Sequence, residues 1–242
     1  GANLIYSTYY GGTGTEVANT LRVNSLGELV VVGSTTSSNL PVTTGAYDAT
    51  FNGITDIFVA HFNNDGTQLL GATYVGGSGS DPALMDINYP PSTFPITGLG
   101  GALTSPCEVI FDASNNIWVV SNSNSNNFPT TANALQGAIG GGFDGVLFQL
   151  NPTCSNLMYS TFIGGSANDG IYNIGFSSTG NIVICGGTQS TNFPTTAGSL
   201  HASAPGGSWD GFATVLNPTG TAILYGTYLG TNLSDNATKL QI

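Results

Sequence analysis

Acidic side chains recur at two fixed places in this sequence, and they are the first candidates for chemistry. One set stands four residues after a glycine pair or its equivalent and consists of Glu16, Asp81, Asp169 and Asp235. Around Asp81 the sequence Gly76-Gly-Ser-Gly-Ser-Asp81 fits the Gly-Gly-x-Gly-x-Asp core of a calcium-binding nonapeptide repeat. Such sites need tandem copies, whereas this motif returns only after 65 residues or more. We therefore expect each carboxylate to cap a loop by accepting backbone N–H groups, with a calcium site as the alternative.

The second acidic set comprises Asp56, Asp144 and Asp210, each of which enters an apolar run. An aspartate at the mouth of a strand is typical of an Asx-turn, in which the side chain bonds its own backbone. We expect this structural role here rather than that of a metal ligand.

Catalytic constellations find little support in the sequence. His61 lies inside a strand-like run and His201 in a Ser/Ala/Pro loop. The chain has no nucleophile elbow, no His-Glu-x-x-His zinc motif and no phosphate-binding glycine loop with lysine. Its two basic residues, Arg22 and Lys239, leave almost nothing to stabilise developing negative charge. We therefore expect a protein that is not an enzyme and has no cofactor, and we assign no catalytic, cofactor-binding or metal-binding residue.

Charge excludes further classes of function. Two basic against thirteen acidic residues give a net charge of −11, so nucleic acid and anionic membranes would be repelled. No apolar stretch is long enough to span a membrane. Charged residues make up only 6% of the chain, and a surface of Ser, Thr, Asn and Gly suggests an extracellular or cell-surface setting.

The elements that position these residues belong to a repeat. One stretch, Leu157-Met-Tyr-Ser-Thr-Phe-Ile-Gly-Gly165, has counterparts that begin at Leu4, Leu69 and Ile223. The intervals between them, 65, 88 and 66 residues, indicate a repeat architecture. The repeats run over about 13–77, 78–165 and 166–231. Each also carries an Asn-x-Pro triplet, namely Asn39-Leu-Pro41, Asn127-Phe-Pro129 and Asn192-Phe-Pro194.

Four strands fit each repeat. The first strand ends in a glycine-containing hairpin turn such as 23–28 or 176–181. The second is continuously apolar, as in 29–32, 117–120 and 182–185, which predicts burial on both faces. The third follows the aspartate, as in 56–62 and 144–150, and the fourth is the recurrent stretch. Short antiparallel sheets repeated along the chain favour an all-β propeller of four-stranded blades over a β-solenoid or a sandwich.

Residues of about 82–104 are the only long insertion. The segment carries four prolines together with Leu84, Met85, Tyr89 and Phe94, which predicts a rigid, partly apolar loop. Insertions on one face of a propeller commonly carry binding specificity, so a protein or carbohydrate ligand is one expectation. The alternative is a loop that covers an edge or packs on a neighbouring domain.

The three cysteines do not recur at equivalent positions of the repeats. Cys185 aligns with Val32 and Val120 and is expected to be a small buried hydrophobe. Cys154 aligns with turn glycines, so it should adopt a positive φ at a cost of ~1 kcal/mol or more. A disulfide to Cys107 would explain that position, but the two residues should lie at opposite ends of a blade, which argues against the bond.

A family resemblance enters with the motifs. Tyr159-Ser-Thr-Phe-Ile-Gly-Gly165, an acidic residue, a Gly-Asn hairpin and Asn192-Phe-Pro-Thr-Thr196 resemble the SBBP repeat, which is named for a seven-bladed β-propeller and occurs in bacterial surface and secreted proteins. The resemblance covers nearly the whole chain except 82–104. It implies a propeller fold and no catalytic residues.

Three full repeats are flanked by a fourth-strand sequence at Leu4–Tyr10 and a first-strand sequence at Ala237–Ile242. A closed propeller takes ~4–8 blades, so we expect a segment of a longer chain or a ring that needs further blades or subunits.

The resulting hypothesis is a non-catalytic propeller that acts as an adhesion or binding scaffold for protein or carbohydrate. One alternative is a polysaccharide-active hydrolase or lyase, which would need two or more carboxylates in one pocket at the ring axis. The other is a passive spacer in a surface fibre, which would show no loop-dependent binding.

Overall fold

Three four-stranded antiparallel sheets make up the computed structural model, which describes residues 3–4, 6–81 and 107–241. Strands follow one another in chain order within each sheet. The first sheet contains β1 (Glu16–Val23), β2 (Leu29–Thr35), β3 (Asp56–Phe62) and β4 (Leu69–Val75). The second contains β5 (Glu108–Phe111), β6 (Ile117–Ser123), β7 (Asp144–Leu150) and β8 (Leu157–Ile163), and the third β9 (Asp169–Phe176), β10 (Ile182–Thr188), β11 (Asp210–Leu216) and β12 (Ile223–Leu229).

Glycine sets the turns between strands where the sequence predicts it. Gly27 and Gly180 in the β1–β2 and β9–β10 hairpins both have φ of 80°. Gly66 and Gly220, between the third and fourth strands, have φ of 69° and 74°. These are left-handed conformations that glycine adopts without a Cβ clash, so the predicted hairpins are confirmed.

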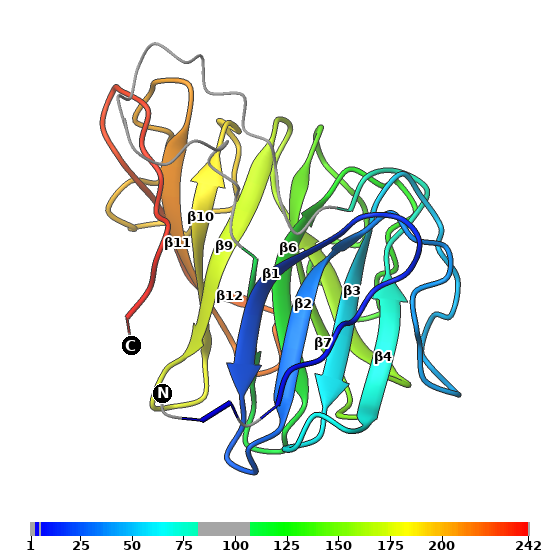
Figure 1. Ribbon diagram of the computed structural model, residues 1–242. Coiled ribbons are helices and arrows are strands. Elements are labelled where there is room, and N and C mark those ends of the chain that lie inside the picture. The colour runs from blue at the N-terminus through cyan, green and yellow to red at the C-terminus, as the bar shows by residue number, and fades with distance from the viewer. Residues whose placement is uncertain (1–2, 5, 82–106, 242) are drawn as a thin grey trace.

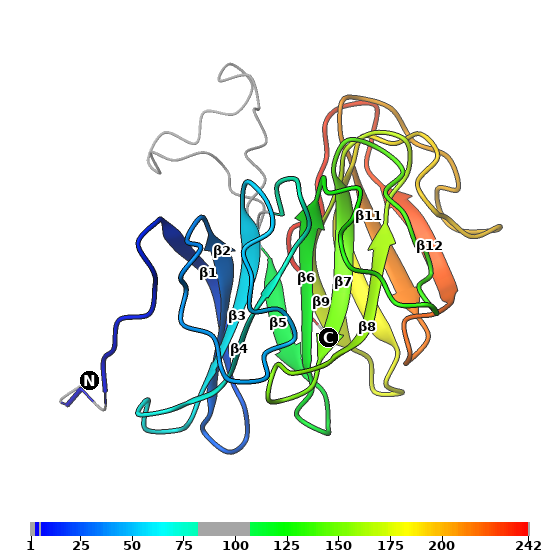
Figure 2. The same ribbon diagram turned by 90° about the vertical axis from the view of Figure 1, so that its right-hand side faces the viewer.

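The sheets stack side by side in chain order, as Figure 2 shows. Apolar residues of the first and second sheets share one buried cluster, and those of the second and third share another. All seven residues of β6, in the middle sheet, are buried. Burial on both faces explains why the second strands lack the alternation of a half-exposed strand.

The first strands of the three sheets are neighbours. Contacts join β1 to β5 and β5 to β9, and in Figure 1 β1 and β9 lie on the same side of the molecule. The C-terminal segment continues this series, because Leu240 N donates a 3.3 Å hydrogen bond to Asn173 Oδ1 on β9. The first strands of the three sheets and the C-terminal segment therefore lie in series along this line.

Two predicted strands were wrong. The described residues of 4–10 and 237–241 form no strand. The first-named segment resembles a fourth strand and the second a first strand, and neither has a neighbouring strand of its own sheet to supply a hydrogen-bonded ladder. They instead lie beside the first and third sheets. The expected loop at about 82–104 lies outside the described residues, and the described part contains no helix that could cross a membrane.

Candidate functional site

The first acidic set caps loops, as predicted. Each carboxylate accepts the backbone N–H of the residue four positions earlier: Gly12 N to Glu16 at 3.1 Å, Gly77 N to Asp81 at 2.6 Å, Gly165 N to Asp169 at 2.6 Å and Thr231 N to Asp235 at 2.7 Å. Serine hydroxyls near the end of the second strand add to this, as in Ser190 Oγ, which follows β10 and donates to Asp169 Oδ2 at 2.7 Å. Because N–H and O–H donors face these oxygens, the arrangement favours the capping role over a calcium site.

The second acidic set has the same structural role but not the predicted Asx-turn. Asn52 N donates to Asp56 Oδ2 and Gly140 N to Asp144 Oδ2, both at 2.8 Å and both from four residues earlier. The acceptor therefore closes a wider loop than the two-residue reach of an Asx-turn. Among the described residues no group of three His, Cys, Asp or Glu side chains could hold a metal ion.

The two acidic sets meet at the first glycine of the recurrent pair. A Cβ on Gly76 would lie 2.6 Å from Asp56 Oδ1 and 2.9 Å from Asp81 Oδ2. Burial raises the pKa of Asp56 to about 7, and the nearby charge of Asp81 adds to that shift. Burial raises the pKa of Asp144 to about 6, and Asp169 contributes there in the same way. Glycine is needed here because a side chain would displace one of the two carboxylates.

The Asn-x-Pro triplet also acquires a role. The side-chain oxygen of Asn192 accepts hydrogen bonds from both the backbone N and the hydroxyl of Ser166, each at 2.9 Å. Asn39 bonds Thr13 and Asn127 bonds Ser78 in the same manner. The asparagine of each triplet thus fixes the loop that follows the glycine pair and leads into the first strand of the same sheet. This contact explains why the triplet and the glycine pair recur together.

The histidines have structural contacts. His61 is buried, its Nδ1 lies 2.8 Å from Pro152 O, and its Nε2 lies 3.5 Å from a Glu28 carboxylate oxygen. His201 is exposed, and its backbone N bonds Thr227 Oγ1. His61 therefore belongs to the packing between the first and second sheets.

All three cysteines are buried free thiols. Cys154 has φ of 51°, as its alignment with turn glycines predicts. Cys185 is buried like the valines with which it aligns. Burial raises the pKa of Cys154 and of Cys185 to about 12. The structure contains no bond between Cys107 and Cys154.

A pocket of about 660 Å³ lies along the first strands, and it holds both basic residues of the chain. We call it the first-strand pocket. Arg22 comes from β1 and Lys239 from the C-terminal segment. Its walls also include Asn24, Ser25, Glu108, Phe111, Asp112, Asn115, Asn173 and Phe176. Two cations that are 217 positions apart in an acidic chain therefore converge on one hollow.

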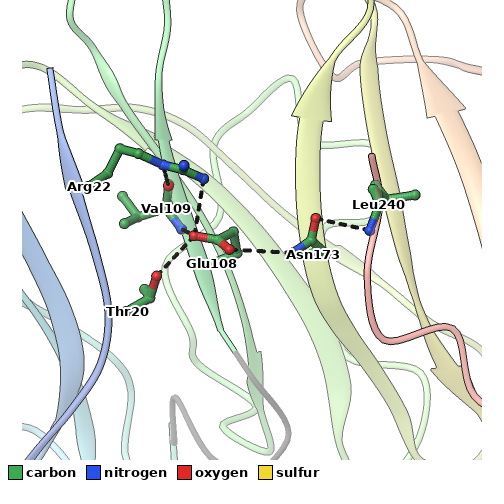
Figure 3. Close-up of polar contacts among 6 residues, drawn as sticks. All are labelled: Thr20, Arg22, Glu108, Val109, Asn173 and Leu240. Atoms are coloured by element: carbon green, nitrogen blue, oxygen red, sulfur yellow. Dashed lines mark hydrogen bonds and ion pairs between the residues drawn. The ribbon is translucent and has the colours of Figure 1, made fainter. Parts of the chain in front are cut away.

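Glu108 is the centre of the polar contacts in this pocket (Figure 3). Its Oε1 accepts from Thr20 Oγ1 at 2.9 Å and lies 3.5 Å from Arg22 Nη2. Its Oε2 accepts from Asn173 Nδ2 at 3.3 Å. Arg22 also donates through Nε to Val109 O at 3.3 Å. One carboxylate thus links the first strands of all three sheets.

Asp112 is the second carboxylate of the pocket, and donors surround it. Asn116 and Ser114 donate from the turn, while Trp118 Nε1 and Gln149 Nε2 donate to Oδ2 at 3.2 and 2.9 Å. Burial would raise its pKa, but the hydrogen bonds, led by that from the Asn116 side chain, hold the pKa below its usual range. Asp112 is accordingly an ionised structural group.

Sequence reasoning missed this site, although a signal for it exists. Thr20, Glu108 and Asn173 occupy one register position, since they pair with Val32, Val120 and Cys185. Lys239 follows Asp235 by the same four residues that separate Asn173 from Asp169. An alignment on the capping carboxylates therefore places Thr20, Asn173 and Lys239 at one position. The insertion before β5 separates Glu108 from its capping carboxylate, so the alignment does not reveal Glu108.

No family model matches the chain, and no curated protein matches it. The structure itself shows an all-β repeat of three four-stranded antiparallel sheets.

Proposed function

We propose that this chain is part of a non-catalytic β-propeller of a secreted or cell-surface bacterial protein and serves as an adhesion or binding scaffold for protein or carbohydrate. The observation that carries the proposal is the first-strand pocket, where Arg22 and Lys239 meet Glu108. A volume of about 660 Å³ lies within the range of small-ligand sites. The SBBP-like motifs agree with this setting.

Ring closure is part of the proposal. The outer face of the first sheet carries Phe58 and Phe62, and beside it a hollow of about 390 Å³ is lined by Tyr6 and Tyr10. At the other end, Tyr225 of β12 is 40% exposed, whereas its counterpart Tyr159 on β8 is 3% exposed beneath the next sheet. Both ends thus resemble halves of the interface that the chain forms twice internally. Further blades or subunits that cover them would close the ring.

The competing function is a polysaccharide-active enzyme, and one observation favours it: Glu108 and Asp112 both line the pocket. Glycoside hydrolysis needs a carboxylic acid of raised pKa opposite a free carboxylate. Asp112 has a lowered pKa and several donors, and Glu108 is paired with Arg22. These constraints support binding over hydrolysis.

The test uses a steric block at the pocket mouth. Ser25, an exposed turn residue, lines the pocket, and Ser178 occupies the equivalent turn of the third sheet outside it. On an immobilised panel of neutral and acidic oligosaccharides and extracellular-matrix proteins, we expect the unaltered chain and Ser178→Trp to bind the same probes. Ser25→Trp should lose that binding. Equal binding by both variants, or none by any form, would overturn the proposed site.

A further inference from the structure

We propose that the first-strand pocket recognises a single carboxylate carried on a monosaccharide unit, as in a hexuronic acid. The inference rests on the proposed binding function and names the ligand class of the same site. It starts from the distribution of charge. The chain has 13 acidic and two basic residues, yet both basic side chains line this one pocket.

Hydrogen-bonding capacity in the pocket is unevenly used. Asp112 accepts at both oxygens, and so does Glu108. Arg22 has five N–H donors; its Nε donates to Val109 O and its Nη2 lies 3.5 Å from Glu108 Oε1, which leaves the others for a ligand. Lys239 is exposed and forms no hydrogen bond or ion pair within the part of the chain that the structure describes. The charged groups of the pocket therefore have donors left to offer, and these suit a ligand that brings acceptors.

The guanidinium of Arg22 is already oriented. Its ion pair with Glu108 and its bond to Val109 O hold it at the wall, while 48% of the side chain stays exposed. A planar guanidinium fixed in this way suits a planar carboxylate, which can accept two parallel hydrogen bonds. Lys239 adds a second cation to the lining of the same pocket, from the C-terminal segment.

The overall charge limits how many anionic groups the ligand carries. A net charge of −11 repels a polyanion, and Glu108 and Asp112 line the pocket beside its two cations, so the ligand is limited to a single carboxylate. Amide and hydroxyl groups of Asn24, Ser25 and Asn115 line the pocket with the rings of Phe111 and Phe176. Polar groups interleaved with aromatic faces suit the hydroxyls and C–H faces of a sugar ring, and the volume accommodates a terminal monosaccharide.

Calorimetric titration of the 242-residue chain with glucuronate tests this inference. We expect saturable binding with a dissociation constant on the order of 1 mM or tighter. Glucuronate methyl ester and glucose, which lack the charge, should bind at least about tenfold more weakly. N-acetylglycylglycine carries a carboxylate without a sugar ring and should also bind more weakly. Tighter binding of this peptide would reassign the pocket to a peptide carboxyl terminus and overturn the saccharide proposal.

Variants locate the effect. Lys239→Gln should weaken glucuronate binding about tenfold, and Lys239→Arg should retain it. Gln68→Glu makes the same change in net charge at an exposed turn residue that is not among those lining the pocket, and it should leave binding unchanged. Equal loss in Lys239→Gln and Gln68→Glu would reduce the effect to bulk charge and contradict the site. Binding of neutral oligosaccharides in the pocket without glucuronate would overturn this inference while leaving the proposed function intact.

Discussion

Tyr159 lies against Gly220 of the next sheet, and its hydroxyl donates a 2.6 Å hydrogen bond to Gly220 O. The ring of Tyr6 covers Gly66 of the first sheet in the same way, because a Cβ on Gly66 would lie 2.3 Å from Tyr6 Cδ2. The tyrosine of one recurrent stretch is thus seated on the turn glycine of the following repeat. Local turn chemistry and contact between sheets depend on the same residue pair.

Gly220→Ala is expected to destabilise the protein by ~2–4 kcal/mol. The new Cβ would meet the Tyr159 ring at 2.6 Å, and alanine would be held at φ of 74°. Gly180→Ala is the matched control, because its φ is 80° but no atom lies within 4 Å of the new Cβ. It should cost only ~1 kcal/mol of backbone strain. Urea denaturation measures both, and equal losses would contradict the packing role of Tyr159.

Tyr225 occupies the same repeat position as Tyr6 and Tyr159, but among the described residues no turn glycine of a following sheet packs against it. We expect the isolated chain to associate through its two outer faces, so its sedimentation coefficient should rise with concentration. Tyr225→Ser should weaken that association. Leu224→Ser, which changes an exposed neighbour on the opposite side of β12, should not. A mass of 24.6 kDa that does not change with concentration would contradict the closure of the ring by these faces.

Stability should fall as the pH rises from about 4 to 8. Burial raises the pKa of Asp56 to about 7 and of Asp144 to about 6, above the ~4 of an unfolded chain. The folded state therefore holds protons that the unfolded state releases, and the stabilisation present below about pH 4 is lost as pH passes through the folded pKa. For Asp56 the loss is on the order of a few kcal/mol.

Asp56→Asn removes this titration and keeps an acceptor for Asn52 N. Its unfolding free energy, measured by urea titration at pH 4, 6 and 8, should therefore decline less than that of the unaltered chain. Asp81 and Asp48 are the charged groups that face Asp56, and both remain in the variant. Parallel pH profiles for the two proteins would show that Asp56 is ionised in the folded state throughout this range.

The thiols should react slowly in the folded protein. Burial raises the pKa of all three cysteines, so little thiolate is available at pH 8. Iodoacetamide without reductant should label none of them within minutes under native conditions and all three in guanidinium chloride, as counted by intact mass. A single label after denaturation would mean that two of the three are joined, and a label located on Cys185 would identify the pair as Cys107 and Cys154.

Much of the fold could be predicted because repetition supplies three independent copies of each signal. The bounds of β3 and β7 match the predicted third strands, since an aspartate begins each strand and a turn that starts at an asparagine, Asn63 or Asn151, follows it. The terminal strands were mispredicted for a reason that local sequence does not contain. A strand needs a partner, and within the part of the chain that the structure describes the segments at 4–10 and 237–241 have no neighbouring strand of their own sheet.

The contact between sheets at Cys154 shows another limit. A Cβ on Gly71 would lie 2.4 Å from the carbonyl carbon of Thr153 and 2.9 Å from Cys154 N. At this interface the large and small residues are exchanged: glycine replaces the tyrosine, and cysteine replaces the turn glycine. Alignment revealed the odd cysteine and its positive φ, but the compensating Gly71 becomes evident only when the two sheets are seen packed together.

The candidate site was less predictable than the fold. Scarcity of basic residues was an argument against an enzyme, but the sequence did not indicate that Arg22 and Lys239 would share a pocket. Their meeting depends on β1, β5, β9 and the C-terminal segment lying in series. That arrangement follows from sheet stacking rather than from any motif.

Prolonged incubation with an oligosaccharide is the most direct test of whether the first-strand pocket binds a saccharide without cleaving it. A uronate-containing oligosaccharide of defined length is incubated with the chain at saturating concentration, and its length is followed by mass spectrometry while binding is followed by calorimetry. For a non-catalytic binding pocket we expect saturable binding that Ser25→Trp abolishes, with no change in oligosaccharide length. Shortened or unsaturated products that disappear with Glu108→Gln would contradict it and make the first-strand pocket an active site.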